Sequence, residues 1–144
     1  MQLDLDNPVI RLLSEGASIE ATRPDDAWDL YWRAWEAASD AYEACMAAHY
    51  VARFADSAEE RFRWNALAME RALAVADTRA EPFLPSLRLN MGRSFEDLGR
   101  IGEARASYRA ASEGLAGLPV DGYRATLEEA IDRGMQRTAD AAEA

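Results

Sequence analysis

Cys45, His49 and Arg53 are spaced four residues apart and carry the side chains of this chain best suited to chemistry. On a helix this spacing places all three on one face. A thiol beside an imidazole could act as a nucleophile with its general base, if a nearby carboxylate oriented the ring. However, the sequence contains no nucleophile elbow, HExxH motif, Gly-rich phosphate loop or CxxC motif. Catalysis is therefore the less favoured interpretation, and Cys45 fits better as a small buried apolar residue.

The content of metal-ligating and cationic residues narrows the chemistry further. Cys45 is the only cysteine and His49 the only histidine, which is too few for a tetrahedral zinc site without carboxylates. A single cysteine forms no internal disulfide, as expected in a reducing compartment. All 16 basic residues are arginines, so Schiff-base lysines and a P-loop lysine are excluded. We expect no metal and no cofactor.

The charge balance indicates which partners this chain avoids. It has 144 residues and a net charge of −10, which disfavours nucleic acid and anionic membranes. The acidic surface either keeps the protein in solution or forms a rim that favours a basic peptide. No apolar run approaches the ~20 residues of a membrane span. The acidic start MQLDLDNPVIRLL has no basic region of the signal-peptide type, so we expect a cytoplasmic protein.

Helix-forming residues dominate, and clusters of Gly and Pro divide the chain. Cap residues mark several boundaries: Asn7 before Pro8, Asp25, the Ser57–Glu60 capping box, Gly99 as a C-cap, and Asp121. Gly16 is predicted to end the first helix. We therefore predict an all-α fold of seven helices, over residues 8–16, 26–38, 41–55, 58–77, 84–98, 103–115 and 122–139.

Residues 90–113 place small and aromatic side chains at regular steps, namely Gly92, Phe95, Ala104, Tyr108 and Ala111. In this pattern the stretch 85–119 resembles a tetratricopeptide repeat (TPR), a 34-residue helix–turn–helix unit. In that family small residues let two helices touch, while aromatic rings fill the gaps between hairpins. The resemblance implies one TPR-like domain over residues 1–144, a right-handed superhelix of about three hairpins.

The remaining helices fit this scheme less closely. Residues 41–77 form a degenerate hairpin, residues 8–38 a divergent N-terminal hairpin, and residues 121–139 a C-terminal cap. An alternative pairing joins 26–38 with 41–55, with Trp28 at the tryptophan site of the repeat. That pairing would reverse which helices line the concave side.

The TPR resemblance also implies a function, because the family generally binds peptides or proteins on its concave side. His49 and Arg53 would then point into the groove with Asn90 nearby, resembling a carboxylate clamp for an acidic peptide end. The clamp lysines of the family are missing here. The alternative is that His49 is a helix–helix hydrogen-bonding residue and that Arg53 pairs with a nearby acid.

Aromatic residues are concentrated between residues 28 and 64: Trp28, Tyr31, Trp32, Trp35, Tyr42, Tyr50, Phe54, Phe62 and Trp64. They either fill gaps between helices or provide a binding site, with Trp28, Trp32 and Trp35 as anchors. We therefore expect a cytoplasmic peptide-binding adaptor, which could also form a homodimer. The alternative is a small-molecule-binding protein or cofactor-free enzyme with an aromatic pocket around His49.

Overall fold

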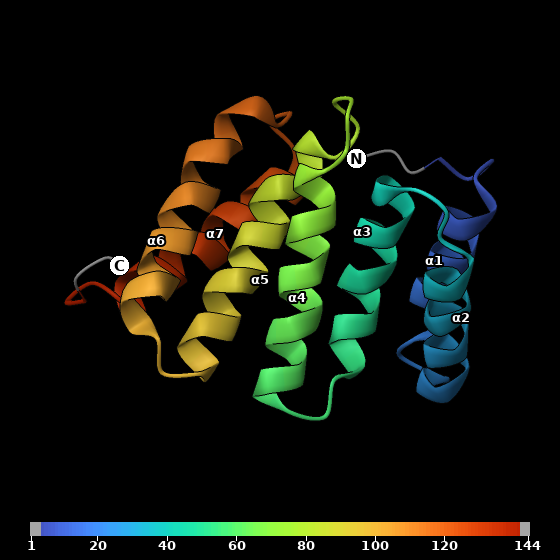
Figure 1. Ribbon diagram of the computed structural model, residues 1–144. Helices are drawn as coiled ribbons and strands as arrows, with labels where there is room; N and C mark the ends of the chain where they lie inside the picture. Colours follow the sequence, from blue (N-terminus) through green and yellow to red (C-terminus); the bar gives the residue numbers. More distant parts are fainter. Residues whose placement is uncertain (1–3, 142–144) are drawn as a thin grey trace. The chain divides into compact units, whose positions relative to one another are not determined.

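The computed structural model describes residues 4–141, and every regular element in that range is helical (Figure 1). This confirms the all-α prediction. None of the helices in this range combines the length and apolar character of a membrane span. The α-helices are α1 (Pro8–Ile19), α2 (Pro24–Ala37), α3 (Ala41–Val51), α4 (Ala58–Leu73), α5 (Leu84–Asp97), α6 (Ile101–Gly114) and α7 (Gly122–Arg137).

Most of the predicted cap residues stand at helix ends. The Asn7 side chain accepts hydrogen bonds from the amides of Val9 and Ile10, with Pro8 in the first turn. The Asp121 carboxylate accepts the amide of Arg124 in the same way. These bonds satisfy amides that a helix leaves without a partner at its start. Each cap therefore fixes where its helix begins.

The capping box of α4 forms in part, and α5 ends at the predicted glycine. The Ser57 hydroxyl accepts the Glu60 amide at 3.1 Å, whereas the Glu60 carboxylate bonds to the Asp56 amide at 3.0 Å instead of that of Ser57. Gly99, after α5, has a φ of 75°, a left-handed conformation that glycine adopts without strain.

Several predicted helix boundaries were wrong. The α-helix predicted over 41–55 ends at Val51, and the one predicted to begin at 103 begins at Ile101. Gly16 does not end α1, which continues to Ile19, because Gly16 is a buried helical residue in contact with a neighbouring helix. Asp25 does not cap α2. Pro24 already occupies its first turn, as its fixed φ allows, and Arg23 stands at the cap position. Finally, α4 ends at Leu73 instead of continuing to residue 77.

The chain divides into two compact units, Met1–Arg79 and Ala80–Ala144. In the first unit α1 packs on α2, α3 packs on α4, and α3 also contacts α1 and α2. In the second unit α5 packs closely on α6, and α7 contacts both. Each unit thus contains a pair of helices and a third helix that packs on both members.

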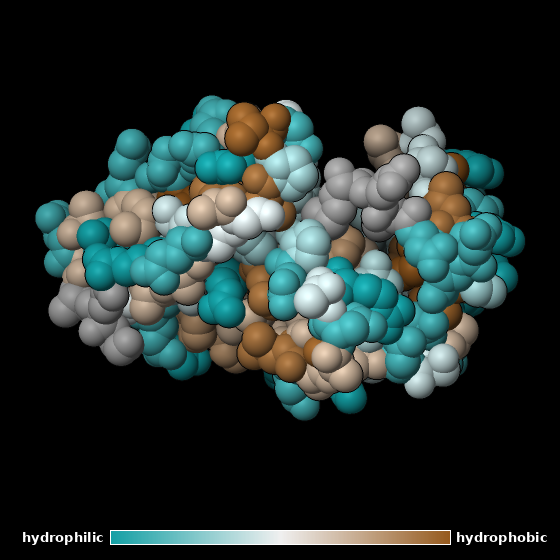
Figure 2. All heavy atoms as spheres, turned by 90° about the horizontal axis from the view of Figure 1, so that it is seen from above, coloured by the Kyte–Doolittle hydropathy of each residue, from teal (hydrophilic) through white to brown (hydrophobic). Residues whose placement is uncertain are grey.

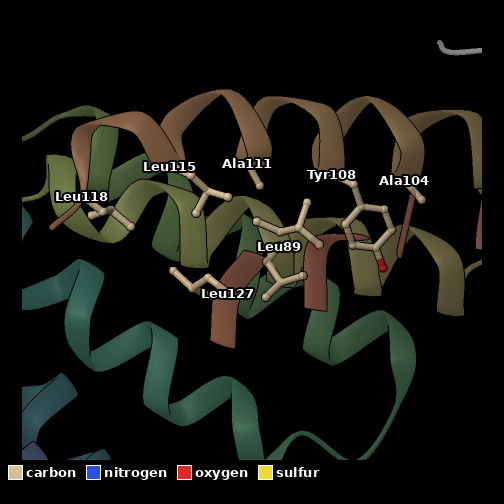
Figure 3. Close-up of a cluster of buried hydrophobic side chains, with 8 residues drawn as sticks. Leu89, Ala104, Tyr108, Ala111, Leu115, Leu118 and Leu127 are labelled. Carbon is tan, nitrogen blue, oxygen red and sulfur yellow. The ribbon is translucent and has the colours of Figure 1, made fainter. Parts of the chain in front are cut away.

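The core of the second unit lies between α5, α6 and α7 (Figure 3). Small and aromatic side chains of α6 face Leu89 of α5 and Leu127 of α7 in this view. The buried members are Leu89, Ala104, Tyr108, Ala111, Leu115, Leu118, Leu127 and Ile131. This cluster contains Ala104, Tyr108 and Ala111 of the 85–119 stretch, and Phe95 packs against it.

The Tyr108 ring fills the space that two glycines leave open. A Cβ on Gly92 would lie 2.5 Å from Tyr108 Cε1, and one on Gly134 would lie 2.6 Å from Cζ. Real Cβ atoms do not approach this closely, so any larger residue must displace the ring or the helix. In the first unit a Cβ on Gly16 would likewise lie 2.5 Å from Tyr31 Cε1.

Candidate functional site

Glu20, Tyr31 and Arg53 form a hydrogen-bonded triad across α1, α2 and the turn after α3. The Tyr31 hydroxyl donates to Glu20 Oε1 at 2.8 Å. The Arg53 guanidinium donates to both carboxylate oxygens, from Nε at 2.9 Å and from Nη2 at 2.6 Å. The arginine lowers the pKa of Glu20, and burial raises the pKa of Tyr31. This first triad therefore ties three elements of the first unit to one carboxylate.

The second unit contains the same arrangement in Glu96, Tyr108 and Arg137. The Tyr108 hydroxyl donates to Glu96 Oε1 at 2.5 Å. Arg137 donates to the same carboxylate, from Nη2 at 3.0 Å and from Nε at 3.1 Å. Burial raises the pKa of Tyr108 to about 12. This second triad joins α5, α6 and the end of α7.

The two triads define an internal repeat that the reading of single motifs missed. In both units a glycine precedes the glutamate by one helical turn, and the tyrosine that packs on this glycine bonds to the glutamate. The sequence signal is Leu-x-x-Gly-x-x-x-Glu followed by Ala-x-x-x-Tyr-x-x-Ala, at residues 13–20 with 27–34 and at 89–96 with 104–111. Comparing the chain with itself would have found it.

Tyr108→Phe is expected to lower the free energy of unfolding of the second unit by about 1–2 kcal/mol, because it removes a hydrogen bond to a charged group. The ring and its contact with Gly92 stay in place. Urea denaturation followed by circular dichroism measures the change. The control is Glu129→Gln, which breaks an exposed ion pair with Arg133 and should cost less than about 0.5 kcal/mol. Equal effects of the two variants would contradict a structural role for the triad.

His49 and Cys45 lie on α3 in protonation states unsuited to nucleophilic catalysis. Burial, with a smaller contribution from Arg53, lowers the pKa of His49 to about 4, and the ring contacts Tyr50 at 5.2 Å between centroids. Burial raises the pKa of Cys45 to about 12. At neutral pH the thiol is therefore protonated and the imidazole uncharged. The pair supplies neither a thiolate nor a cation.

The predicted groove residues fall in different parts of the fold. His49 and Arg53 belong to the first unit, whereas Asn90 lies on α5 of the second unit and is half-buried. The Arg53 guanidinium donates three hydrogen bonds to the Glu20 carboxylate. The three-residue groove stays a prediction from the sequence.

The aromatic residues of the first unit form two series of ring contacts. In one, Tyr31 is fully buried and contacts Tyr50 at 5.0 Å and Phe54 at 5.8 Å. These rings fill space between helices, so for them core packing is the right interpretation. The second series joins four tryptophans of α2 and α4: Trp28, Trp32, Trp35 and Trp64.

We call these four residues the tryptophan face. Trp28 and Trp32 stack with nearly parallel rings, 5.6 Å apart at an interplanar angle of 6°. Trp64 meets Trp32 and Trp35 edge-on, with centroids 6.1 Å and 5.1 Å away. Trp28 is 38% exposed, and the other three are half-buried. The outermost indole is thus supported from beneath by packed rings.

Acidic side chains lie beside the tryptophan face on α2. Asp25, Asp29 and Glu36 are all exposed. We call them the acidic edge. Within residues 4–141 no hydrogen bond or ion pair engages these side chains. Figure 2 shows hydrophilic residues over much of the face in view, with hydrophobic residues in smaller areas.

Comparison of the chain with protein-family models, curated proteins and solved structures finds no match. The tetratricopeptide resemblance therefore rests on the residue pattern of 85–119 alone.

Proposed function

We propose that this chain is a cytoplasmic TPR-like adaptor that binds a protein or peptide through the tryptophan face. The observation that carries this proposal is the exposure of Trp28, a large ring that stacks on Trp32 without being buried. Tryptophan is enriched among the residues that dominate binding energy at protein interfaces. A ring held rigidly in advance loses little conformational entropy when a partner covers it.

The state of the other candidate residues favours this face over capture of an acidic peptide end. An acidic end needs cationic groups, but His49 is uncharged at neutral pH and Arg53 already binds Glu20. Binding at the tryptophan face requires neither protonation of His49 nor release of Arg53 from Glu20. The TPR-like superhelix remains part of the proposal and is supported by the packing of consecutive helices within each unit, α1 to α4 in the first and α5 to α7 in the second.

Trp28→Ala is expected to reduce recovery of a specific partner at least about tenfold, the effect of losing a modest interface hot spot. The measurement is affinity capture from source cells by wild type and variant, with quantitative mass spectrometry. The control is Leu73→Ala, which removes an apolar side chain of the same unit that is 62% exposed. Two outcomes would contradict binding through this face: equal recovery of every partner by wild type and Trp28→Ala, or an equal loss of partners with Trp28→Ala and Leu73→Ala.

A further inference from the structure

We propose that the partner of the tryptophan face is an arginine-bearing segment of another polypeptide, whose guanidinium groups stack on the indoles while bonding to the acidic edge. This inference rests on the proposed function and names the chemistry of its partner. It is derived from the placement of carboxylates around the rings, from two contacts that the chain makes internally, and from the spacing along α2.

The carboxylates stand where a cation on the indoles would meet them. Residues three or four apart are neighbours on a helix, so Asp25 lies next to Trp28. By the same rule Asp29 and Glu36 lie on either side of Trp32 along the helix axis. A guanidinium over these rings would have an exposed carboxylate within reach on one flank.

The chain itself uses this combination of ring, arginine and carboxylate twice. Arg79 lies over the Tyr42 ring, 4.7 Å from its centroid, while its Nε bonds to Asp77 at 3.0 Å. Tyr42, Asp77 and Arg79 all belong to the first unit, which also contains the tryptophan face. The Arg79 contact shows that a guanidinium can stack on a ring and bind a carboxylate at once.

The second instance is in the other unit. Arg100 lies 4.8 Å from the centroid of the Phe95 ring and donates to Glu103 from Nε at 2.6 Å and from Nη2 at 2.5 Å. The tryptophan face and acidic edge present the ring and the carboxylate of this arrangement. Exposed Arg33 lies between Asp29 and Glu36 on α2, but within residues 4–141 no arginine stacks on these indoles. A planar guanidinium can satisfy both, whereas the compact ammonium of lysine does so less well.

The spacing favours arginines at alternate positions of an extended peptide. Trp28 and Trp32 are one helical turn apart, which is about 6 Å along the axis. Alternate residues of an extended chain are separated by about 6.6 Å and point to the same side. Two successive arginines would therefore meet Trp28 and Trp32, and a third would lie toward Trp35 and Glu36. The net charge of −10 attracts such a segment.

The test titrates the full chain with a capped Arg-Gly-Arg-Gly-Arg peptide, followed by calorimetry and by tryptophan fluorescence. We expect saturable binding with a change in fluorescence, at least fivefold weaker for the lysine counterpart and absent for the glutamate counterpart. Trp28→Ala and the double variant Asp29→Asn/Glu36→Gln should each weaken binding at least tenfold. Trp28 is exposed, so its replacement leaves the fold intact, which circular dichroism verifies.

The matched control is Glu128→Gln/Asp132→Asn, which removes two exposed carboxylates of α7 and gives the same net charge. It should bind like wild type. If both double variants weakened binding of the arginine peptide equally, the attraction would come from net charge alone, and the inference would be overturned. Binding of the lysine peptide as strong as that of the arginine peptide would also overturn it, as would Trp28-dependent self-association in sedimentation.

These outcomes are separable from failure of the proposed function. If cellular capture depends on Trp28 but the arginine peptide does not bind, the face is a binding site for a different chemistry. If neither capture nor peptide binding depends on Trp28, both proposals fail.

Discussion

Gly92→Val is expected to lower the free energy of unfolding of the second unit by about 3 kcal/mol, at the upper end of overpacking effects in cores. The first added carbon would already lie 2.5 Å from Tyr108 Cε1. The ring has little room to move aside, because Gly134 closes its other side and Glu96 binds its hydroxyl. Valine forms helix slightly better than glycine, so helix propensity does not account for the loss.

The two units can be observed separately in this experiment. All four tryptophans lie between residues 28 and 64, so their fluorescence reports the first unit, while circular dichroism reports both. In urea, Gly92→Val should shift part of the dichroism transition and leave the fluorescence transition nearly unchanged. The control is Gly122→Val, at a glycine whose added Cβ meets nothing within 4 Å.

A double-mutant cycle tests the cause of this loss. In a Tyr108→Leu background the smaller side chain leaves room for valine, so the cost of Gly92→Val should fall by at least about 1 kcal/mol. An unchanged cost in that background would show that the ring contact is not the source of the destabilisation.

Two glycines, Gly92 and Gly16, illustrate which parts of the fold could be predicted from the sequence. Gly92 lies between residues of an apolar stripe, so its role as a contact site was predictable and a close approach to Tyr108 is observed. Gly16 precedes a polar stretch and equally fits a helix stop. Only its contact with Tyr31, fifteen residues later and on another helix, distinguishes the two roles. Local sequence contains no information on that contact.

The candidate site was predictable to a similar, partial degree. The 3–4 spacing of Trp28, Trp32 and Trp35 places them on one face of a helix, but it does not reveal which rings are buried. Arg53 could equally face a ligand or an acid. Its pairing with Glu20, 33 residues away, depends on how α1, α2 and α3 pack together. The sequence repeat marks the glutamate and the tyrosine of each triad but not the arginine, because the arginine follows its glutamate by 33 residues in the first unit and by 41 in the second.

Wild-type stability is expected to fall by about 2 kcal/mol between pH 7 and pH 5 because of His49, whose folded pKa is about 4 against about 6.5 when unfolded. The sign follows from proton binding. Below pH 6.5 His49 binds a proton in the unfolded chain but stays uncharged in the folded chain, because burial disfavours the imidazolium. This contribution is therefore complete above pH 6.5 and is lost as the pH falls toward 4.

His49→Gln isolates that contribution, because glutamine is polar but does not titrate. Urea denaturation followed by tryptophan fluorescence at pH 7 and pH 5 measures the first unit alone. The variant should lose most of the pH dependence, whatever its stability at pH 7. The pKa values of Glu20 and Glu43 are lowered in the folded chain, so their contributions are present above about pH 4.5 and decline mainly at lower pH. An equal loss in wild type and His49→Gln between pH 7 and pH 5 would mean that His49 is protonated in the folded chain, and so accessible to water or to an anionic partner.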